Sequence, residues 1–257
     1  MKGYNHFILY NPIPIDSLQV NANSFVFKIK IYKGISKTNK TAGILIEGNK
    51  ILVFEQNNIE YLVEKYNLKR FLRDRFNSKI NDYEPIKQVF NYKGDIICLL
   101  VFNDEKNKFI SILNVTRKIE VFRSINLPNS STIDFNGIGG GVTIYGDGVL
   151  LAIGVPSSGY NDNISNLARQ KSSPFGKVLF FNSIDFFKQR KNIYDFKIFT
   201  SGHRNPQGLL NLSQTIYEVE HGPNGGDELN ILSEGKDFGW PTYSFGILMR
   251  DLNIKFQ

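Results

Sequence analysis

Apolar and polar residues alternate with a period of two along most of the chain, which is the pattern of strands with one buried face. Two segments, 43–56 and 141–154, predict hairpins that turn at Gly48-Asn49 and at Gly146-Asp147-Gly148. Amphipathic helices are rare, and the best candidates are 61–76 and 183–190. Strands 94–102 and 108–115 are expected to form a pair joined by the polar turn NDEKN. Further strands are expected at 24–32, 118–125, 177–182, 196–200, 215–220 and 228–233.

Many short strands joined by turn residues predict an all-β fold: a sandwich, a barrel or a propeller. The strands cluster in groups spaced by roughly 40–50 residues, which is the period of propeller blades. A chain of 257 residues is long enough for one large domain or two modest ones. Because no linker-like segment divides it, we expect residues 1–257 to form a single domain.

The composition is that of a globular protein, with 41% hydrophobic and 21% charged residues. A net charge of +7 raises the alternative of a nucleic-acid-binding or membrane-binding surface. No long block of like charge supports it, because the densest basic stretch, 68–76, is interrupted by Asp74. No run of about 18 apolar residues exists. We therefore expect neither a nucleic-acid partner nor a membrane span.

The single cysteine, Cys98, lies in an apolar run and is expected to be a buried core residue. The first 20 residues do not resemble a signal peptide, because their apolar run is short and broken by asparagine and proline. The sequence leaves open whether the chain is cytoplasmic or lacks an exported start, and it predicts no oligomeric state.

Two polar, glycine-punctuated loops carry the candidate chemistry: SGHRNPQG (201–208) and EVEHGPNGGDELN (218–230). In the first, Arg204 offers a planar charged fork that suits a carboxylate or a phosphate, and Asn205 can both donate and accept. For either loop alone a structural role remains open, because Asn-Pro is a common turn signal.

The second loop combines glycines with two acidic residues. Gly222, Gly225 and Gly226 leave backbone groups open, and Asp227 and Glu228 add anionic oxygens. Carbonyl and carboxylate oxygens together suit a hard cation such as calcium. Asp and Glu at strand starts also bond turn amides, so the structural alternative applies here too. Together, the two loops suit a polyanionic organic ligand bridged to a metal ion.

The succession GHRNPQG, EHGPNGGDELN and GKDFGWP (235–241) resembles the signature of the soluble pyrroloquinoline-quinone (PQQ)-dependent sugar dehydrogenases. This is the glucose/sorbosone and aldose sugar dehydrogenase family of six-bladed β-propellers. The resemblance is close through 202–241 and extends more weakly upstream, so family motifs are recognisable over 137–241. It implies an incomplete propeller of about four blades, and it leaves open a fragment, a degenerate relative or closure by association.

The resemblance also implies site residues. Arg204 and Asn205 match the positions that contact the quinone. The backbone carbonyls of Gly222 and Pro223 match those that hold calcium. Two further side chains would line the same pocket: His221 and Asp227.

The implied reaction is oxidation of an aldose C1 hydroxyl to a lactone, with electrons passed to an external acceptor. Members of the family are usually periplasmic or secreted. His203 is expected to support its loop by hydrogen bonding rather than to react, and Trp240 and Pro241 are expected to pack a turn.

The family pattern is broken where its general base is expected. The base is a histidine in a pattern like His-x-Gly-Gly-Arg, and this chain has Gly137 in its place and Gly141 at the arginine. Val155 replaces an aspartate, and Asp134 is the nearest titratable group. Glycine cannot act as a base, so no catalytic residue is assigned and activity is expected to be weak or absent. The alternative function is a catalytically inactive propeller that serves as a binding or interaction module.

Overall fold

The computed structural model describes residues 15–22, 25–31, 41–47, 50–55, 58–67, 82–83, 87–103, 106–130, 132–135, 137–157, 162–223 and 225–244. The chain divides into two compact units. The first comprises Met1–Glu105 and Ile112–Lys118, and the second Lys106–Ser111 and Ile119–Gln257. The expectation of a single domain over 1–257 stays a prediction.

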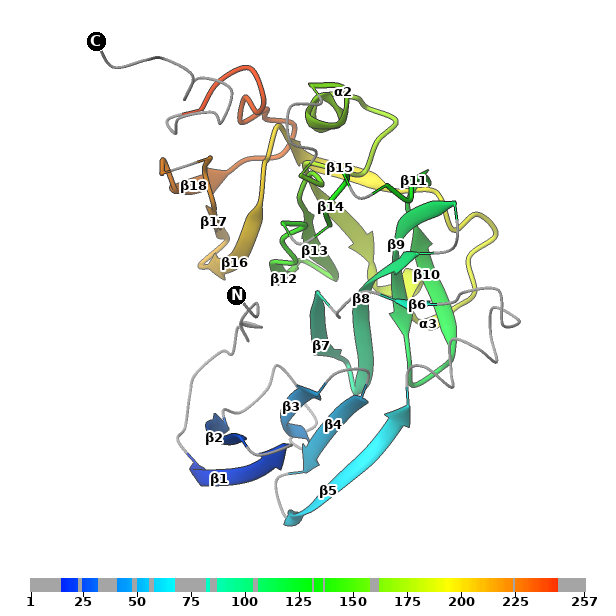
Figure 1. Ribbon diagram of the computed structural model, residues 1–257, viewed down its shortest axis with the longest axis vertical. Helices are drawn as coiled ribbons and strands as arrows, with labels where there is room; N and C mark the ends of the chain where they lie inside the picture. Colours follow the sequence, from blue (N-terminus) through cyan, green and yellow to red (C-terminus); the bar gives the residue numbers. More distant parts are fainter. Residues whose placement is uncertain are drawn as a thin grey trace. The chain divides into compact units, whose positions relative to one another are not determined.

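The described residues of the first unit form antiparallel strands and the turns between them (Figure 1). β1 (Ile15–Ala22) pairs with β2 (Phe25–Ile31), and β3 (Thr41–Glu47), β4 (Lys50–Glu55) and β5 (Asn58–Asn67) form a three-stranded sheet. β6 (Asp82–Tyr83) and β7 (Gln88–Tyr92) each pair with β8 (Asp95–Asn103). The predicted hairpin at 43–56 is confirmed as β3–β4, although its turn residues lie outside the described residues.

The helix predicted over 61–76 is wrong for residues 61–67, which belong to β5. Val63 of β5 lies opposite Val53 of β4, so sheet pairing prevails over the helical spacing of the apolar residues. Residues 68–76 lie outside the described part of the chain. Cys98 in β8 is buried and free, as expected, and burial raises the pKa of its thiol.

The second unit contains two well-formed antiparallel sheets that lie side by side in Figure 1. The strands of the first sheet are β12 (Val142–Tyr145), β13 (Gly148–Ile153), β14 (Lys177–Asn182) and β15 (Lys197–Ser201). The second sheet consists of β16 (Pro206–Leu212), β17 (Thr215–Glu220) and β18 (Glu228–Leu232). The predicted hairpin at 141–154 is confirmed as β12–β13.

Shorter elements complete this unit. β9 (Asn107–Asn114) belongs to this unit as far as Ser111. β10 (Ile119–Arg123) and β11 (Leu127–Pro128) come next along the chain. α2 (Asp162–Ser165) and the 3₁₀ turn η1 (Asn166–Ala168) precede β14. The helix predicted over 183–190 is present but shorter, as α3 (Ser183–Phe187), because Lys188 is extended. A capping box between Asn182 and Asp185 fixes its start.

The two sheets share one apolar core. Its members come from one face of each sheet: Leu150, Ala152, Val178, Phe199, Leu209, Ile216 and Leu232. Side chains alternate along a strand, so the face of β17 that buries Ile216 also buries Glu218 and Glu220. Two carboxylates are thus carried into the interior beside the predicted site.

The first polar loop is shorter than the sequence suggests. β15 runs to Ser201 and β16 begins at Pro206, so only Gly202–Asn205 connect the two sheets. Within the described ranges, no helix is long and apolar enough to cross a membrane.

Candidate functional site

The glycine-rich stretch 137–141 lies against the first polar loop. The Gly140 N–H donates to the carbonyl oxygen of Pro206 at 3.2 Å, and the Val155 N–H donates to that of Arg204 at 2.8 Å. Gly139 has φ +78, and a Cβ there would clash with the Pro206 carbonyl. Segments that are about 65 residues apart in sequence therefore meet at one place.

Gly137 lies directly beside Asn205. A Cβ built on Gly137 would stand 3.5 Å from Asn205 Nδ2 and 3.6 Å from Ser157 Oγ, which are ordinary van der Waals distances. The backbone of Gly137 is outside the left-handed region. A Cβ at this position would fit, and it would lie next to the residue predicted to contact a cofactor.

The other departures from the family pattern have different environments. A Cβ on Gly141 would come within 2.9 Å of the carbonyl carbon of Gly208, so the close approach of β16 excludes a side chain there. Val155 is buried. Asp134 pairs with Ser157 through its backbone, and its side chain is exposed.

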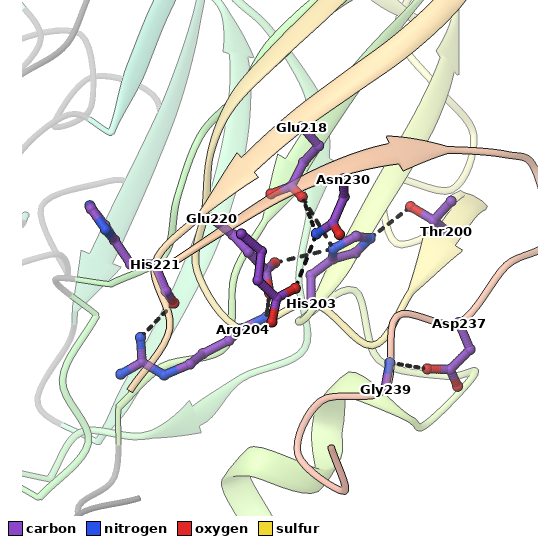
Figure 2. Close-up of polar contacts among 10 residues, drawn as sticks. Thr200, His203, Arg204, Glu218, Glu220, His221, Asn230, Asp237 and Gly239 are labelled. Carbon is purple, nitrogen blue, oxygen red and sulfur yellow. Dashed lines mark hydrogen bonds and ion pairs between the residues drawn. The ribbon is translucent and has the colours of Figure 1, made fainter. Parts of the chain in front are cut away.

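Arg204 joins the two polar loops. Its Nη1 donates to the carbonyl oxygens of His221 at 2.8 Å and Gly222 at 3.1 Å, and Figure 2 shows the first of these bonds. Its guanidinium carbon lies 5.5 Å from the centre of the Trp240 ring. Burial lowers the pKa of Arg204, and the carboxylates of Glu220 and Asp227 act in the opposite direction.

Asp227 closes the second loop. Its Oδ1 accepts the Gly222 N–H at 3.1 Å, and its Oδ2 lies 3.2 Å from His221 Nδ1. The hydrogen bond with His221, followed by that from Gly222, holds the pKa of the Asp227 carboxyl below its usual range. The Asn205 carbonyl accepts the His221 N–H at 3.1 Å. Five predicted site residues are thus connected: Arg204, Asn205, His221, Gly222 and Asp227. Pro223 is buried next to them.

His203 is fully buried and hydrogen-bonded on both ring nitrogens. Nε2 lies 2.8 Å from Thr200 Oγ1, and Nδ1 lies 3.2 Å from Glu220 Oε2. The ring stacks on Phe238 at 4.8 Å between centroids. The hydrogen bonding expected of His203 is observed. Trp240 is also buried, as expected for a packed turn.

Lys177 and Glu218 are two of the buried charged residues of this region to which the sequence assigned no role. Lys177 Nζ donates to the carbonyl oxygens of Leu167 at 3.0 Å, Ala168 at 2.6 Å and Phe175 at 3.0 Å. Burial lowers the pKa of Lys177 to about 8, against the opposing charge of Asp237. Glu218 is the second, and burial followed by the charge of Glu220 raises its pKa to about 8. The sequence does contain a signal for both residues: each is a charged residue within a predicted strand, KVLFFN for Lys177 and TIYEVE for Glu218.

A comparison with protein families now adds to this geometry. The glucose/sorbosone dehydrogenase model matches residues 112–255, which is more than half of the chain and includes both polar loops. The chain belongs to the glucose/sorbosone dehydrogenase family. The predicted resemblance is therefore confirmed.

Two named relatives match shorter segments. The aldose sugar dehydrogenase YliI of Escherichia coli is 49% identical over 53 residues, which cover 20% of this chain and 14% of the relative. Quinoprotein glucose dehydrogenase B of Acinetobacter calcoaceticus is 47% identical over 46 residues, which cover 18% of this chain and 10% of the relative. The matches span only a small part of each relative.

A solved glucose dehydrogenase structure matches a larger part of the present chain. The TM-score is 0.54 at 20% sequence identity, and the match covers 81% of this chain and 63% of the other. The likeness confirms the predicted all-β fold of the quinoprotein sugar dehydrogenase propeller type. The chain corresponds to less than two thirds of that structure.

Proposed function

We propose that the two polar loops bind PQQ. Arg204 and Asn205 are the groups that would contact it, since the quinone carries carboxylates that a guanidinium can hold through paired hydrogen bonds. Arg204 now donates to two backbone carbonyls, so binding would exchange these neutral acceptors for charged ones. The name of the Acinetobacter relative, a quinoprotein, supports the cofactor class.

Calcium is the metal that this donor set fits. Gly222 and Pro223 offer carbonyl oxygens, and Asp227 adds a carboxylate from the same short loop. Hard cations prefer such oxygens. Because Arg204 Nη1 lies 3.1 Å from the Gly222 oxygen, we expect the guanidinium to turn away from it when a cation binds. His221 and Asp227 would then line the pocket.

PQQ and calcium, held by these loops, would supply the hydride-accepting chemistry that oxidises C1 of an aldose to a lactone, with the electrons passed on to an external acceptor. The chain's own residues bind and orient: Arg204 and Asn205 fix the cofactor, and buried His203 fixes the loop that carries them. No side chain at position 137 takes the proton from the sugar hydroxyl. A missing general base typically costs about 10²–10⁴-fold in rate.

A single observation carries this proposal. The position that the family alignment assigns to the base, Gly137, lies 3.5 Å (from its built Cβ) from the amide of Asn205. A base at position 137 would stand beside the residues proposed to bind the cofactor, as the family alignment requires. The absence of that base would therefore slow proton removal from the sugar hydroxyl. We infer a sugar-dehydrogenase-like protein with slow aldose oxidation.

Dye reduction tests the proposed activity. The protein loaded with PQQ and calcium should reduce an artificial electron acceptor slowly in the presence of an aldose such as glucose. The rate should fall to background when PQQ is omitted or calcium is chelated. Fast turnover, comparable to that of a family member with the histidine, would contradict the role assigned to the missing base.

The second candidate is a catalytically inactive propeller that acts as a binding module. The lack of any titratable group at Gly137 favours it. Cofactor binding without measurable turnover, over the whole range of aldoses tested, is the result that this alternative predicts.

A further inference from the structure

Three side chains that can ligate a metal ion meet inside the second unit. His203 comes from the loop between β15 and β16, and Glu218 and Glu220 from the inner face of β17 (Figure 2). His203 Nδ1 lies 3.2 Å from Glu220 Oε2 and 4.0 Å from Glu218 Oε2. One ligand atom from each residue lies within 4.8 Å of the other two. Atoms that share one zinc ion at about 2.0–2.2 Å lie at most about 4.4 Å from each other, and both distances from His203 Nδ1 are below that limit.

The cluster is buried and contains two acidic side chains. The side chains of His203 and Glu218 are fully buried, and that of Glu220 is 5% exposed. Glu218 Oε1 is buried and accepts no hydrogen bond from the part of the chain that the structure describes. Two buried carboxylates need a cation between them, either protons or a metal ion. Burial and the neighbouring charge of Glu220 also raise the pKa of Glu218.

Each candidate ligand is already held by a second contact. If His203 Nε2–H donates to Thr200 Oγ1 at 2.8 Å, the lone pair of Nδ1 is directed at the carboxylates. Glu220 Oε1 accepts the Arg204 N–H at 3.4 Å, which leaves Oε2 toward His203. Asn230, opposite Glu218 on β18, donates to Glu218 Oε2 at 2.9 Å. Such outer contacts orient the ligands of protein metal sites.

We propose that His203, Glu218 and Glu220 form a buried site for a divalent transition metal ion, with zinc as the reference ion. One imidazole and two carboxylates match the preference of zinc for nitrogen and oxygen ligands in a small coordination shell. Calcium, which prefers six to eight oxygens, fits this cluster poorly. The proposed ion is structural: it joins β17 to the loop that carries Arg204, and it does not depend on the proposed quinone site.

The test is titration of the metal-stripped, full 257-residue chain with zinc chloride by calorimetry near pH 7.5. We expect one zinc ion per chain and a rise in melting temperature that a chelator reverses. Glu218→Gln keeps the shape of the side chain and removes its charge, and it should weaken zinc binding by at least about 100-fold. Glu234→Gln, a change of the same kind at an exposed residue paired with Lys197, should leave it unchanged.

A second variant separates this cluster from the exposed loop. His221 lies beside Asp227 and can attract zinc on its own. Zinc affinity that survives Glu218→Gln but is lost in His221→Gln would overturn the proposal. Cobalt chloride gives a measurement on the unmodified chain: the visible absorption bands of low-coordinate cobalt should appear at one equivalent. Their absence from the folded protein, or the absence of stoichiometric zinc binding, would also overturn it.

Discussion

Replacing Gly137 with histidine is expected to raise the rate of aldose oxidation by the PQQ-loaded protein about 10²–10⁴-fold. The new imidazole would start beside Asn205 and Ser157, where a built Cβ makes ordinary contacts of 3.5 and 3.6 Å. Its ordinary pKa, near 6.5, allows it to accept the proton of the sugar hydroxyl at neutral pH. The measurement is steady-state dye reduction with excess PQQ, calcium and glucose.

Gly137→Gln is the matched control, because it adds a polar side chain of similar length without a basic group. It should bind PQQ as the unmodified protein does and show no gain in rate. If Gly137→His binds PQQ with unchanged affinity and the rate does not rise, position 137 is not the place of the base. An equal gain in rate in both variants would show that the added side-chain volume, and not proton transfer, accounts for the gain.

Replacing Lys177 with methionine is expected to lower the free energy of unfolding by roughly 3–5 kcal/mol. The ammonium group donates to three carbonyl oxygens, those of Leu167, Ala168 and Phe175, at the end of η1 and before β14. Methionine fills a similar volume but removes all three of these hydrogen bonds. The carbonyls of Leu167 and Ala168 keep the N–H groups of Gln170 and Gly202, and that of Phe175 loses its donor. The loss of three charge-assisted hydrogen bonds exceeds what a better apolar fit can return.

Urea unfolding followed by circular dichroism measures this effect. Lys171→Met removes an exposed lysine from the same region and should change stability by less than about 0.5 kcal/mol. If the Lys177→Met protein is as stable as this control, water or other donors replace the lost hydrogen bonds, and the buried lysine does not hold η1 in place.

Strands were the most predictable part of the fold. The expected boundaries of β14 and β17 are those observed, because both segments are rich in β-branched and aromatic residues and are bounded by polar or turn residues. β5 was mistaken for a helix, since its apolar residues also fit helical spacing and only pairing with β4 decides between them. β16 was missed because its first residues, Pro206 to Gly208, belong to a motif that suggests a loop.

The candidate site was predictable to the extent that family motifs label its residues. Arg204, His221 and Asp227 lie in loops that the motifs mark, and the structure joins them by direct hydrogen bonds or through backbone carbonyls. Glu218 and Lys177 lie within the same span of family motifs, 137–241, but no role was assigned to either of them. Their importance arises from burial among polar partners supplied by distant segments, and a strand pattern cannot show which face of the strand is enclosed.

The central claim is that the loops 202–230 form a quinone site, and calorimetric titration of the protein with PQQ in excess calcium tests it most directly. The account predicts saturable binding that Arg204→Ala weakens at least tenfold, since a charge-assisted hydrogen-bond pair is lost. Lys236→Ala, which removes an exposed cation elsewhere, should not change it. Absence of binding by the folded protein, or equal affinity in Arg204→Ala, would contradict the account.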